Sequence, residues 1–297
     1  MKPACQGNPA HRKIVSMASA LPNGTLACIT QLRAQLSEYG QNYAQSHGLA
    51  HQLSYGGVPA VVFQASDDRR HGNFLPPSYR AILKNPEWRR RLAKPHPQSK
   101  SLPSAGRRWC ELDSCNSSDA LLMNVFCFPG VASSLQLLHL LGAEADGPPQ
   151  FGYRARVPLL QGRFDRTEVD MRLGNLLVEA KLTEGDFQRK SKAALVCYRD
   201  FAEVFYRRQL PQQLNCYLSY QLIRNVLAAH ATGFSFCVLS DARRPDLLEA
   251  WFQVMQAIRP AELRVRCKVL TWQELAIMLP QKLQQFLEEK YAIFAGS

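Results

Sequence analysis

The feature that most constrains this chain is a pair of short segments in which polar and apolar residues alternate. The first covers residues 167–173, the second covers residues 177–182, and Gly174-Asn175 lies between them. Alternation with a period of two is typical of a β-strand that buries one face, and a Gly-Asn dipeptide between two such runs is typical of a two-residue hairpin turn. We therefore predict a tight β-hairpin whose apolar face the rest of the chain must cover.

The turn determines which residues of the two strands face each other. With the loop at these two residues, counting outward places Asp170 opposite Glu179 and Glu168 opposite Lys181. Successive strand residues point to opposite sides of a sheet, so these four side chains should share one face. The opposite, inward-packing face carries Val169, Met171, Val178 and Ala180.

Asp170 and Glu179 are a pair of like charges. Directly opposed Cβ atoms lie roughly 4.5–5.5 Å apart, so two carboxylates in such a pair repel unless a cation lies between them. Mg²⁺ is typically held by one or two carboxylates while it keeps water and substrate phosphate as its other ligands. The alternative is a solvated face with cross-strand ion pairs, but such a surface has no reason to pair two acids. We expect a divalent metal site.

This arrangement resembles the signature of the PD-(D/E)XK nuclease superfamily. Asp170 is followed by eight residues and then by Glu179-Ala180-Lys181. The resemblance implies Mg²⁺, or Mn²⁺, held by Asp170, Glu179 and the Ala180 carbonyl, with Lys181 orienting the attacking water. It also implies that Glu168 tunes Lys181 or forms an ion pair with it. The implied reaction is the metal-assisted hydrolysis of nucleic-acid phosphodiester bonds, endonucleolytic rather than exonucleolytic.

A second segment resembles a little-characterised bacterial branch of the same superfamily. Residues 117–124 read Ser-Ser-Asp-Ala-Leu-Leu-Met-Asn, similar to a helix that precedes the catalytic strands in that branch, and the two serines are predicted to cap it. The resemblance implies three further site residues: Glu111 as an added acid of the metal site, Gln221 as a helix residue that points at the site, and Arg224 as a nucleic-acid contact. The alternatives are capping or solvation for Glu111 and an exposed surface position for Gln221.

The predicted order of elements indicates an α/β protein with a mixed sheet. The capped helix is followed by a helix over residues 133–141, a strand over 151–160, the hairpin, further helices, and a strand over 234–239. This order is that of the αβββαβ core of the restriction-endonuclease-like fold, with added helices. The other predicted elements are helices over 26–43, 76–85, 86–92, 186–209, 215–230 and 246–258, strands over 59–63 and 264–270, and one or two helices from Trp272 onward.

Most of the positive charge lies in the first third of the chain. The formal net charge is +12, and residues 1–110 hold 15 Lys and Arg against 4 Asp and Glu. A basic segment beside a nearly neutral one points to a polyanionic partner, although a basic linker that aids solubility is the alternative. We predict a basic N-terminal extension over residues 1–106, with an amphipathic helix and a Pro/Ser-rich linker, and a PD-(D/E)XK nuclease-like domain over 107–297. The residues expected to contact phosphates are Arg89, Arg90, Arg91, Lys94, Lys100, Arg107 and Arg108.

The cysteines and the apolar segments favour a cytoplasmic location. Nine cysteines form no C-x-x-C pair, and several lie in apolar runs, which is typical of a reducing compartment. The first residues lack the apolar core of a signal peptide. The longest apolar region, residues 120–143, is interrupted by polar residues and by Pro129-Gly130, so no membrane span is expected.

Two alternatives to a DNA nuclease stay open from the sequence. A non-catalytic nucleic-acid-binding or scaffold protein can share the fold, because a fold alone does not confer activity. A nuclease or toxin that acts on RNA would need the same set of site residues. DNA is the expected partner, and a homodimer is left open.

Overall fold

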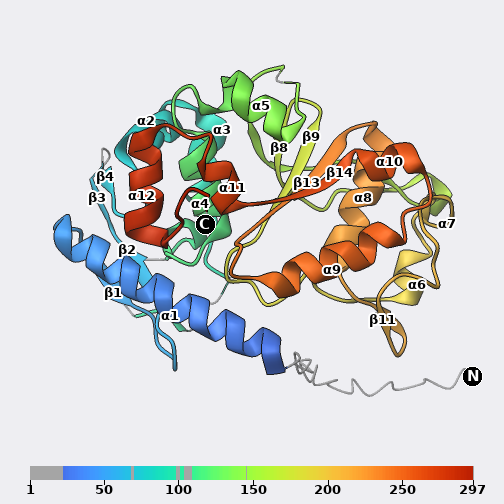
Figure 1. Cartoon of the computed structure of the whole chain (residues 1–297), viewed down its shortest axis with the longest axis horizontal. Helices are drawn as coiled ribbons and strands as arrows, with labels where there is room; N and C mark the ends of the chain where they lie inside the picture. Colours follow the sequence, from blue (N-terminus) through green and yellow to red (C-terminus); the bar gives the residue numbers. More distant parts are fainter. Residues whose placement is uncertain (1–22, 68–69, 98–100, 104–108, 145, 297) are drawn as a thin grey trace, which may run out of the picture.

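A mixed five-stranded sheet forms the centre of the molecule, with helices on both of its faces (Figure 1). The computed structural model describes residues 23–67, 70–97, 101–103, 109–144 and 146–296. In spatial order the strands are β14 (Cys267–Thr271), β13 (Ser235–Ser240), β9 (Leu176–Ala180), β8 (Val169–Leu173) and β5 (Gln150–Tyr153).

The predicted αβββαβ order is confirmed by the way these strands pair. β8 and β9 are the antiparallel hairpin, β5 runs antiparallel to β8, and β13 runs parallel to both β9 and β14. The core helices are α4 (Ser118–Phe126) before the three antiparallel strands and α8 (Tyr220–Thr232) before β13. Every residue of β9 is buried, because helices cover both faces of a sheet that contains parallel strands.

One face of the sheet is covered by α4 together with helices from the C-terminal part of the chain. All nine residues of α4 are buried, and the Ser117 hydroxyl accepts a hydrogen bond from the Ala120 N–H at 3.1 Å, so the predicted cap is confirmed. Leu122 of α4 packs in the same hydrophobic cluster as Val178 of β9. The other helices of this layer are α5 (Leu135–Leu141), α11 (Trp272–Ala276) and α12 (Gln281–Tyr291).

The opposite face of the sheet is covered by α8 and α9 (Pro245–Gln256), with two short helices at its edge. Leu177 of β9 and Phe236 of β13 pack there against Val226 of α8 and Trp251 of α9. The edge helices are α7 (Phe201–Val204) and α10 (Ala261–Val265).

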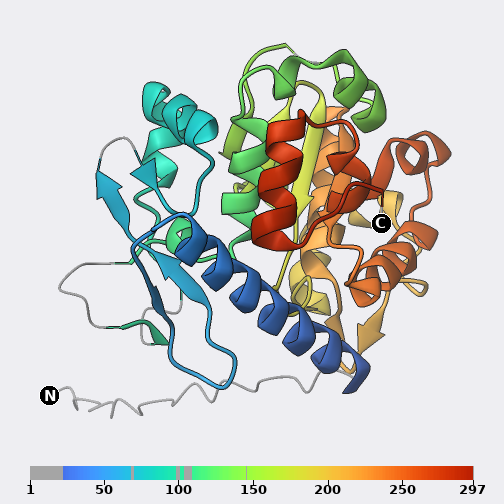
Figure 2. The same ribbon diagram turned by 60° about the vertical axis from the view of Figure 1, so that its left-hand side comes forward.

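The described part of the predicted N-terminal extension packs onto the sheet domain. The amphipathic helix is confirmed as α1 (Asn23–Ser46), which lies beside α12 (Figure 2). Leu32 and Leu36 of α1 belong to the same cluster as the strands of the hairpin, so both parts share one hydrophobic core. The predicted boundary at residue 106 lies outside the described residues. The other elements of this part are β1 (His51–Leu53), β2 (Val61–Phe63), β3 (Ala65–Asp67), β4 (Arg70–His71), α2 (Pro76–Lys84) and α3 (Pro86–Arg91).

The predicted long helix over residues 186–209 is wrong. This region instead forms α6 (Lys192–Leu195), α7 and the short strand β10 (Lys190–Ser191). Its apolar residues are nevertheless buried: Phe187, Leu195 and Phe201 all lie in the second cluster. The apolar spacing indicated correctly which residues are buried. Short elements joined by turns bury them here, and no continuous helix is required.

Three other elements have different limits from those predicted. The strand expected over 151–160 is divided, because β6 (Val157–Pro158) leaves the central sheet to pair with β7 (Phe164–Asp165). The helix expected from residue 215 begins at Tyr220, since its first residues form β12 (Cys216–Tyr217), which pairs with β11 (Gln212–Gln213). The strand expected from residue 264 begins at Cys267 after α10.

Among the helices that the structure describes, none is long and apolar enough to cross a membrane.

Candidate functional site

The site is built at the end of the β8–β9 hairpin. Gly174 has a φ of +55°, which the predicted turn requires, and Leu173 faces Leu176. The ladder continues as far as the pair Met171 and Val178, in the predicted register. The next pair in this register would be Asp170 and Glu179, the two acids of the predicted metal site, so the regular pairing of the hairpin ends where the candidate site begins.

The two strands part at the candidate acids, where the β8–β9 ladder ends while β9 stays paired with β13. The Ala180 N–H, which a continued ladder would direct at the backbone of β8, is donated to the Asp170 carboxylate at 2.8 Å. The Lys181 N–H is donated to the Leu239 carbonyl of β13 at 2.8 Å. The opened end of the hairpin therefore exposes the Asp170 carboxylate to the space between the strands.

Glu179 and Lys181 form a buried ion pair at this opening. The Lys181 Nζ lies 2.9 Å from the Glu179 carboxylate. Lys181 is only 5% exposed and Glu179 only 2%. Asn225 of α8 donates a hydrogen bond to the other oxygen of Glu179 at 2.8 Å, and Lys181 lies over the Phe187 ring. The alternative of a solvated polar face does not hold for Glu179 and Lys181, because α8 covers this side of the hairpin.

The charges at the opening are dominated by carboxylates. Burial raises the pKa of Asp170 well above its ordinary value of 3.8, and the negative charges of Glu179 and Asp119 raise it further, against a smaller opposite effect of Lys181. Burial alone would lower the pKa of Lys181, but Glu179, Glu184 and Asp170 outweigh it, so the lysine stays protonated. The set of acids is thus short of positive charge, which is the condition under which a cation is bound.

Asp119 is a residue of this site that the sequence did not identify. It lies in the first turn of α4, is 6% exposed, and accepts hydrogen bonds from Arg91 at 2.7 Å and from Lys94 at 3.2 Å. Sequence reasoning selected Glu111 as the additional acid. The signal for Asp119 was its place as an acid in the first turn of the helix that precedes the hairpin. Helix capping and the helix dipole also explain an acid at this position.

Glu111 itself lies nearby but outside that helix. It begins a short 3₁₀ turn (Glu111–Asp113), and its carboxylate lies 2.6 Å from the Lys94 Nζ. Burial raises the pKa of Glu111, as does Asp119, and Lys94 acts in the opposite direction. Glu111, Lys94 and Asp119 therefore form one connected set of charges at the edge of the site.

Glu168 lies apart from Lys181, in contrast to the prediction. β8 begins at Val169, and the Glu168 carboxylate instead accepts hydrogen bonds from Arg91 at 3.0 Å and from Arg154 at 3.2 Å. Its side chain is 37% exposed. The difference arises because the two strands have already parted at this level, which takes Glu168 away from the lysine.

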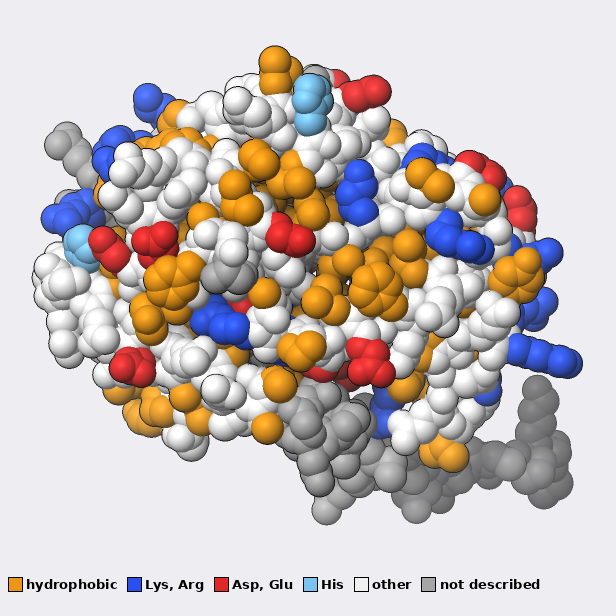
Figure 3. Space-filling view, in the orientation of Figure 1, with side chains coloured by type: hydrophobic (Ala, Val, Ile, Leu, Met, Phe, Trp, Pro, Cys, Tyr) orange, Lys and Arg blue, Asp and Glu red, His pale blue; other side chains and the backbone are white. Residues whose placement is uncertain are grey.

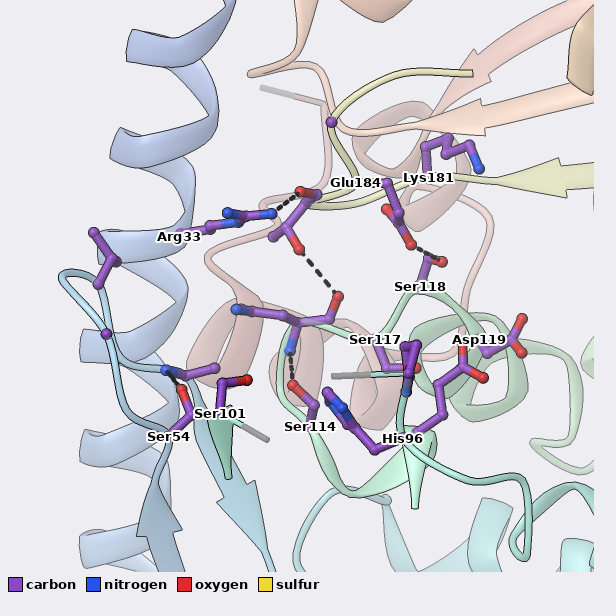
Figure 4. A pocket seen from close by; sticks show the side chains of 18 of the residues that line it. Arg33, Ser54, His96, Ser101, Ser114, Ser117, Ser118, Asp119, Lys181 and Glu184 are labelled. Atoms are coloured by element: carbon purple, nitrogen blue, oxygen red, sulfur yellow. Dashed lines mark hydrogen bonds between the residues drawn. The ribbon is translucent and has the colours of Figure 1, made fainter. Parts of the chain in front are cut away.

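A cavity of about 840 Å³ opens beside Asp170 and Lys181. Figure 4 shows Asp119 and Lys181 on one side of it and Arg33 of α1 on the other. Glu184 lines it too, and its carboxylate joins the start of α4 to the end of β9 by hydrogen bonds with the Ser118 hydroxyl and the Leu182 N–H. A volume of this size lies within the range typical of ligand sites, roughly 300–1,000 Å³.

Gln221 and Arg224, the two predicted residues of α8, differ in their surroundings. Gln221 lines the cavity, and its buried Oε1 has no hydrogen-bond partner in the described part of the chain. Arg224 is 1% exposed, and its guanidinium is bound by the Asp165 carboxylate and the Thr167 carbonyl, among others. The structure corrects the prediction of a nucleic-acid contact for Arg224, because burial gives this side chain a structural role.

The residues predicted to contact phosphates also differ in their exposure. Arg89 and Arg90 of α3 are exposed. Arg91 turns inward to Asp119 and Glu168, with a side chain that is 14% exposed. The predicted contacts Lys100, Arg107 and Arg108 lie outside the described residues.

The described residues contain no group of three or more His, Cys, Asp and Glu side chains arranged to hold a metal ion as they stand. Cysteines in the described ranges are free thiols, and burial raises the pKa of Cys115 to about 11 and of Cys237 to about 12. The Cys115 and Cys237 thiols are therefore protonated and packed in the core. Among the oxygen donors that line the cavity, Asp170 and the backbone of Ala180 lie together at the opening of the hairpin, with Glu179 behind them.

The mixed sheet, the opened hairpin and the acids beside its lysine define a restriction-endonuclease-like protein. The chain belongs to the family described as restriction endonuclease associating with ARP (REase-ARP), whose model matches residues 39–292. The matched range includes α4, the hairpin and α8, and it begins within α1. No curated protein and no solved structure matches the chain.

Proposed function

We propose that this protein is a nuclease of the PD-(D/E)XK type that uses Mg²⁺, or Mn²⁺, to hydrolyse phosphodiester bonds, with DNA as the favoured substrate. The observation that carries the proposal is the opened end of the hairpin. There the Asp170 carboxylate faces the cavity, and the ion pair of Glu179 and Lys181 lies directly behind it. Membership of a restriction endonuclease family supports nuclease activity.

The residues present fit a hard divalent cation. Two carboxylates and a backbone carbonyl, from Asp170, Glu179 and Ala180, are oxygen donors of the kind that Mg²⁺ prefers, and Mg²⁺ commonly takes only one or two protein carboxylates. Burial raises the pKa of Asp170 most, and repulsion by Glu179 and Asp119 raises it further. A cation would relieve this repulsion. When bound, the metal would lower the pKa of a bound water and neutralise charge on the phosphate.

Each side chain has a definite task in this proposal. Lys181 is held protonated beside Glu179, and its fixed charge would orient the attacking water and stabilise the charge that grows on the phosphate. Gln221 offers an unpaired Oε1 to a water or a substrate group in the cavity. Asp119 is held by Arg91 and Lys94, and its negative charge still acts on Asp170, so it would contribute without binding the metal itself.

The charge distribution favours a nucleic-acid substrate. Residues 1–110 carry 15 Lys and Arg against 4 Asp and Glu. Lys and Arg side chains lie at the margin of the molecule where α2 lies, and others lie at the opposite margin (Figure 3). Exposed Arg89 and Arg90 on the neighbouring α3 can reach backbone phosphates, which hold a duplex without reading its sequence.

Cleavage assays test the proposal directly. Closed circular plasmid, single-stranded DNA and RNA are each incubated with the protein in Mg²⁺, Mn²⁺ or EDTA, since only an endonuclease can cut a circle. Asp170→Asn and Glu179→Gln should abolish cleavage, whereas Asp146→Asn, an exposed carboxylate that pairs with Arg172 outside the cavity, should not. Binding of nucleic acid with no cleavage in any metal would instead indicate the non-catalytic alternative, and cleavage of RNA alone would indicate an RNA-directed nuclease.

A further inference from the structure

The wall of the cavity that faces the acids is formed by α1, and it contains an arginine. Arg33 extends from α1 towards the loop after β9 (Figure 4). One of its N–H groups is donated to the Thr183 carbonyl at 3.0 Å. A guanidinium carries five N–H donors in a fixed plane, so this single bond leaves most of them to the cavity.

Arg33 differs from the other cations of the cavity in its pairing. Lys94 lies 2.6 Å from Glu111, and Lys181 lies 2.9 Å from Glu179. No carboxylate among the described residues lies within ion-pairing distance of Arg33. Of the three Lys and Arg side chains that line the cavity in the described residues, Arg33 is therefore the one whose charge no carboxylate neutralises, and it can bind an anionic ligand.

The surroundings of Arg33 leave its positive charge poorly compensated. Burial lowers the pKa of Arg33, and the neighbouring Arg244 lowers it further, while Glu184 acts in the opposite direction. Arg244 is fully buried and already bound by the Asp246 carboxylate and by backbone carbonyls. An anion beside Arg33 would supply the charge that the protein itself does not.

We infer that Arg33 binds a backbone phosphate of the nucleic acid that occupies the cavity. The inference rests on the proposed nuclease function and makes α1 part of the substrate site, although most of this helix precedes the matched family region. A planar guanidinium can donate two parallel hydrogen bonds to a phosphate. The acids at Asp170 would then hold the reacting end of the strand, while Arg33 holds a neighbouring phosphate at the opposite wall.

The decisive variant is Arg33→Gln, because glutamine can still donate to the Thr183 carbonyl but carries no charge. Fluorescence anisotropy with a labelled DNA duplex in EDTA measures binding without cleavage. The Kd should rise about tenfold or more, and the slope of log K against log salt should fall by about 0.9. Arg33→Lys should keep the slope near that of the wild type. Arg207→Gln, an exposed arginine that follows α7 outside the cavity lining, is the matched control and should change neither quantity.

Equal salt slopes for the wild type and Arg33→Gln would overturn the inference, as would equal losses in Arg33→Gln and Arg207→Gln. A second readout separates this result from failure of the nuclease proposal. If the wild type binds no nucleic acid, thermal melts in inorganic phosphate and in chloride at equal ionic strength decide the matter. Phosphate that stabilises the wild type but not Arg33→Gln would keep the anion site, and no difference between the two would exclude it.

Discussion

The raised pKa of Asp170 leads to a measurable pH dependence of stability. The pKa of Asp170 in the folded protein lies well above 3.8, mainly because of burial and then because of Glu179 and Asp119. In the unfolded chain the same carboxyl loses its proton near its ordinary pKa. Between these two values the folded state holds a proton that the unfolded state has released, so stability is highest at the acid end of this window and falls as the pH rises through the folded pKa.

The magnitude follows from the linkage of one proton. A difference of one bound proton changes the free energy of unfolding by about 1.4 kcal/mol per pH unit, which is the upper limit of the effect for Asp170. Asp170→Asn removes the titrating group, while the amide oxygen can still accept the Ala180 N–H that the carboxylate binds at 2.8 Å. The variant should therefore be more stable than the wild type at neutral pH, and the advantage should shrink as the pH falls towards the ordinary pKa.

Urea unfolding in EDTA at about pH 5 and about pH 8 measures this difference. The quantity compared is the free energy of unfolding of Asp170→Asn minus that of the wild type at each pH, with Asp146→Asn as the control carboxylate. Added Mg²⁺ should stabilise the wild type and have little effect on Asp170→Asn. A difference that is the same at both pH values would show that the pKa of Asp170 is not raised in the folded protein, and the charge argument for a cation at this place would fail.

Three further changes test the packing and the charge assignments. Lys181→Ala should lower the free energy of unfolding by about 3–5 kcal/mol because it leaves Glu179 buried without its partner, and adding Glu179→Gln should recover most of this loss in urea melts. Leu122→Ala should cost about 2–5 kcal/mol because this side chain is fully buried against the sheet; a change below about 0.5 kcal/mol would place its helix outside the core. Arg89→Ala combined with Arg90→Ala should lower the salt slope of duplex binding by about 1.8, or 0.9 for each residue, whereas an unchanged slope would make both a solvated helix face.

Local patterns predicted the central part of the fold correctly. The hairpin register followed from alternation and a two-residue turn, both of which depend on neighbouring residues only. The break between α2 and α3 followed from Pro86, and the start of α4 followed from its serine cap. The prediction of a helix over residues 186–209 was wrong because the apolar spacing indicated which residues would be buried but not which elements would bury them.

The sequence by itself determined the register that brings Asp170, Glu179 and Lys181 to the end of one hairpin, because period-two alternation and turn chemistry act within a few residues. Only the tertiary structure decided what surrounds them. The burial of Glu179 and Lys181 under α8, and the approach of Asp119 and Arg33 to one cavity, join segments 46 or more residues apart or on different elements. Such contacts are chosen by the packing of whole layers against the sheet, which no local pattern encodes.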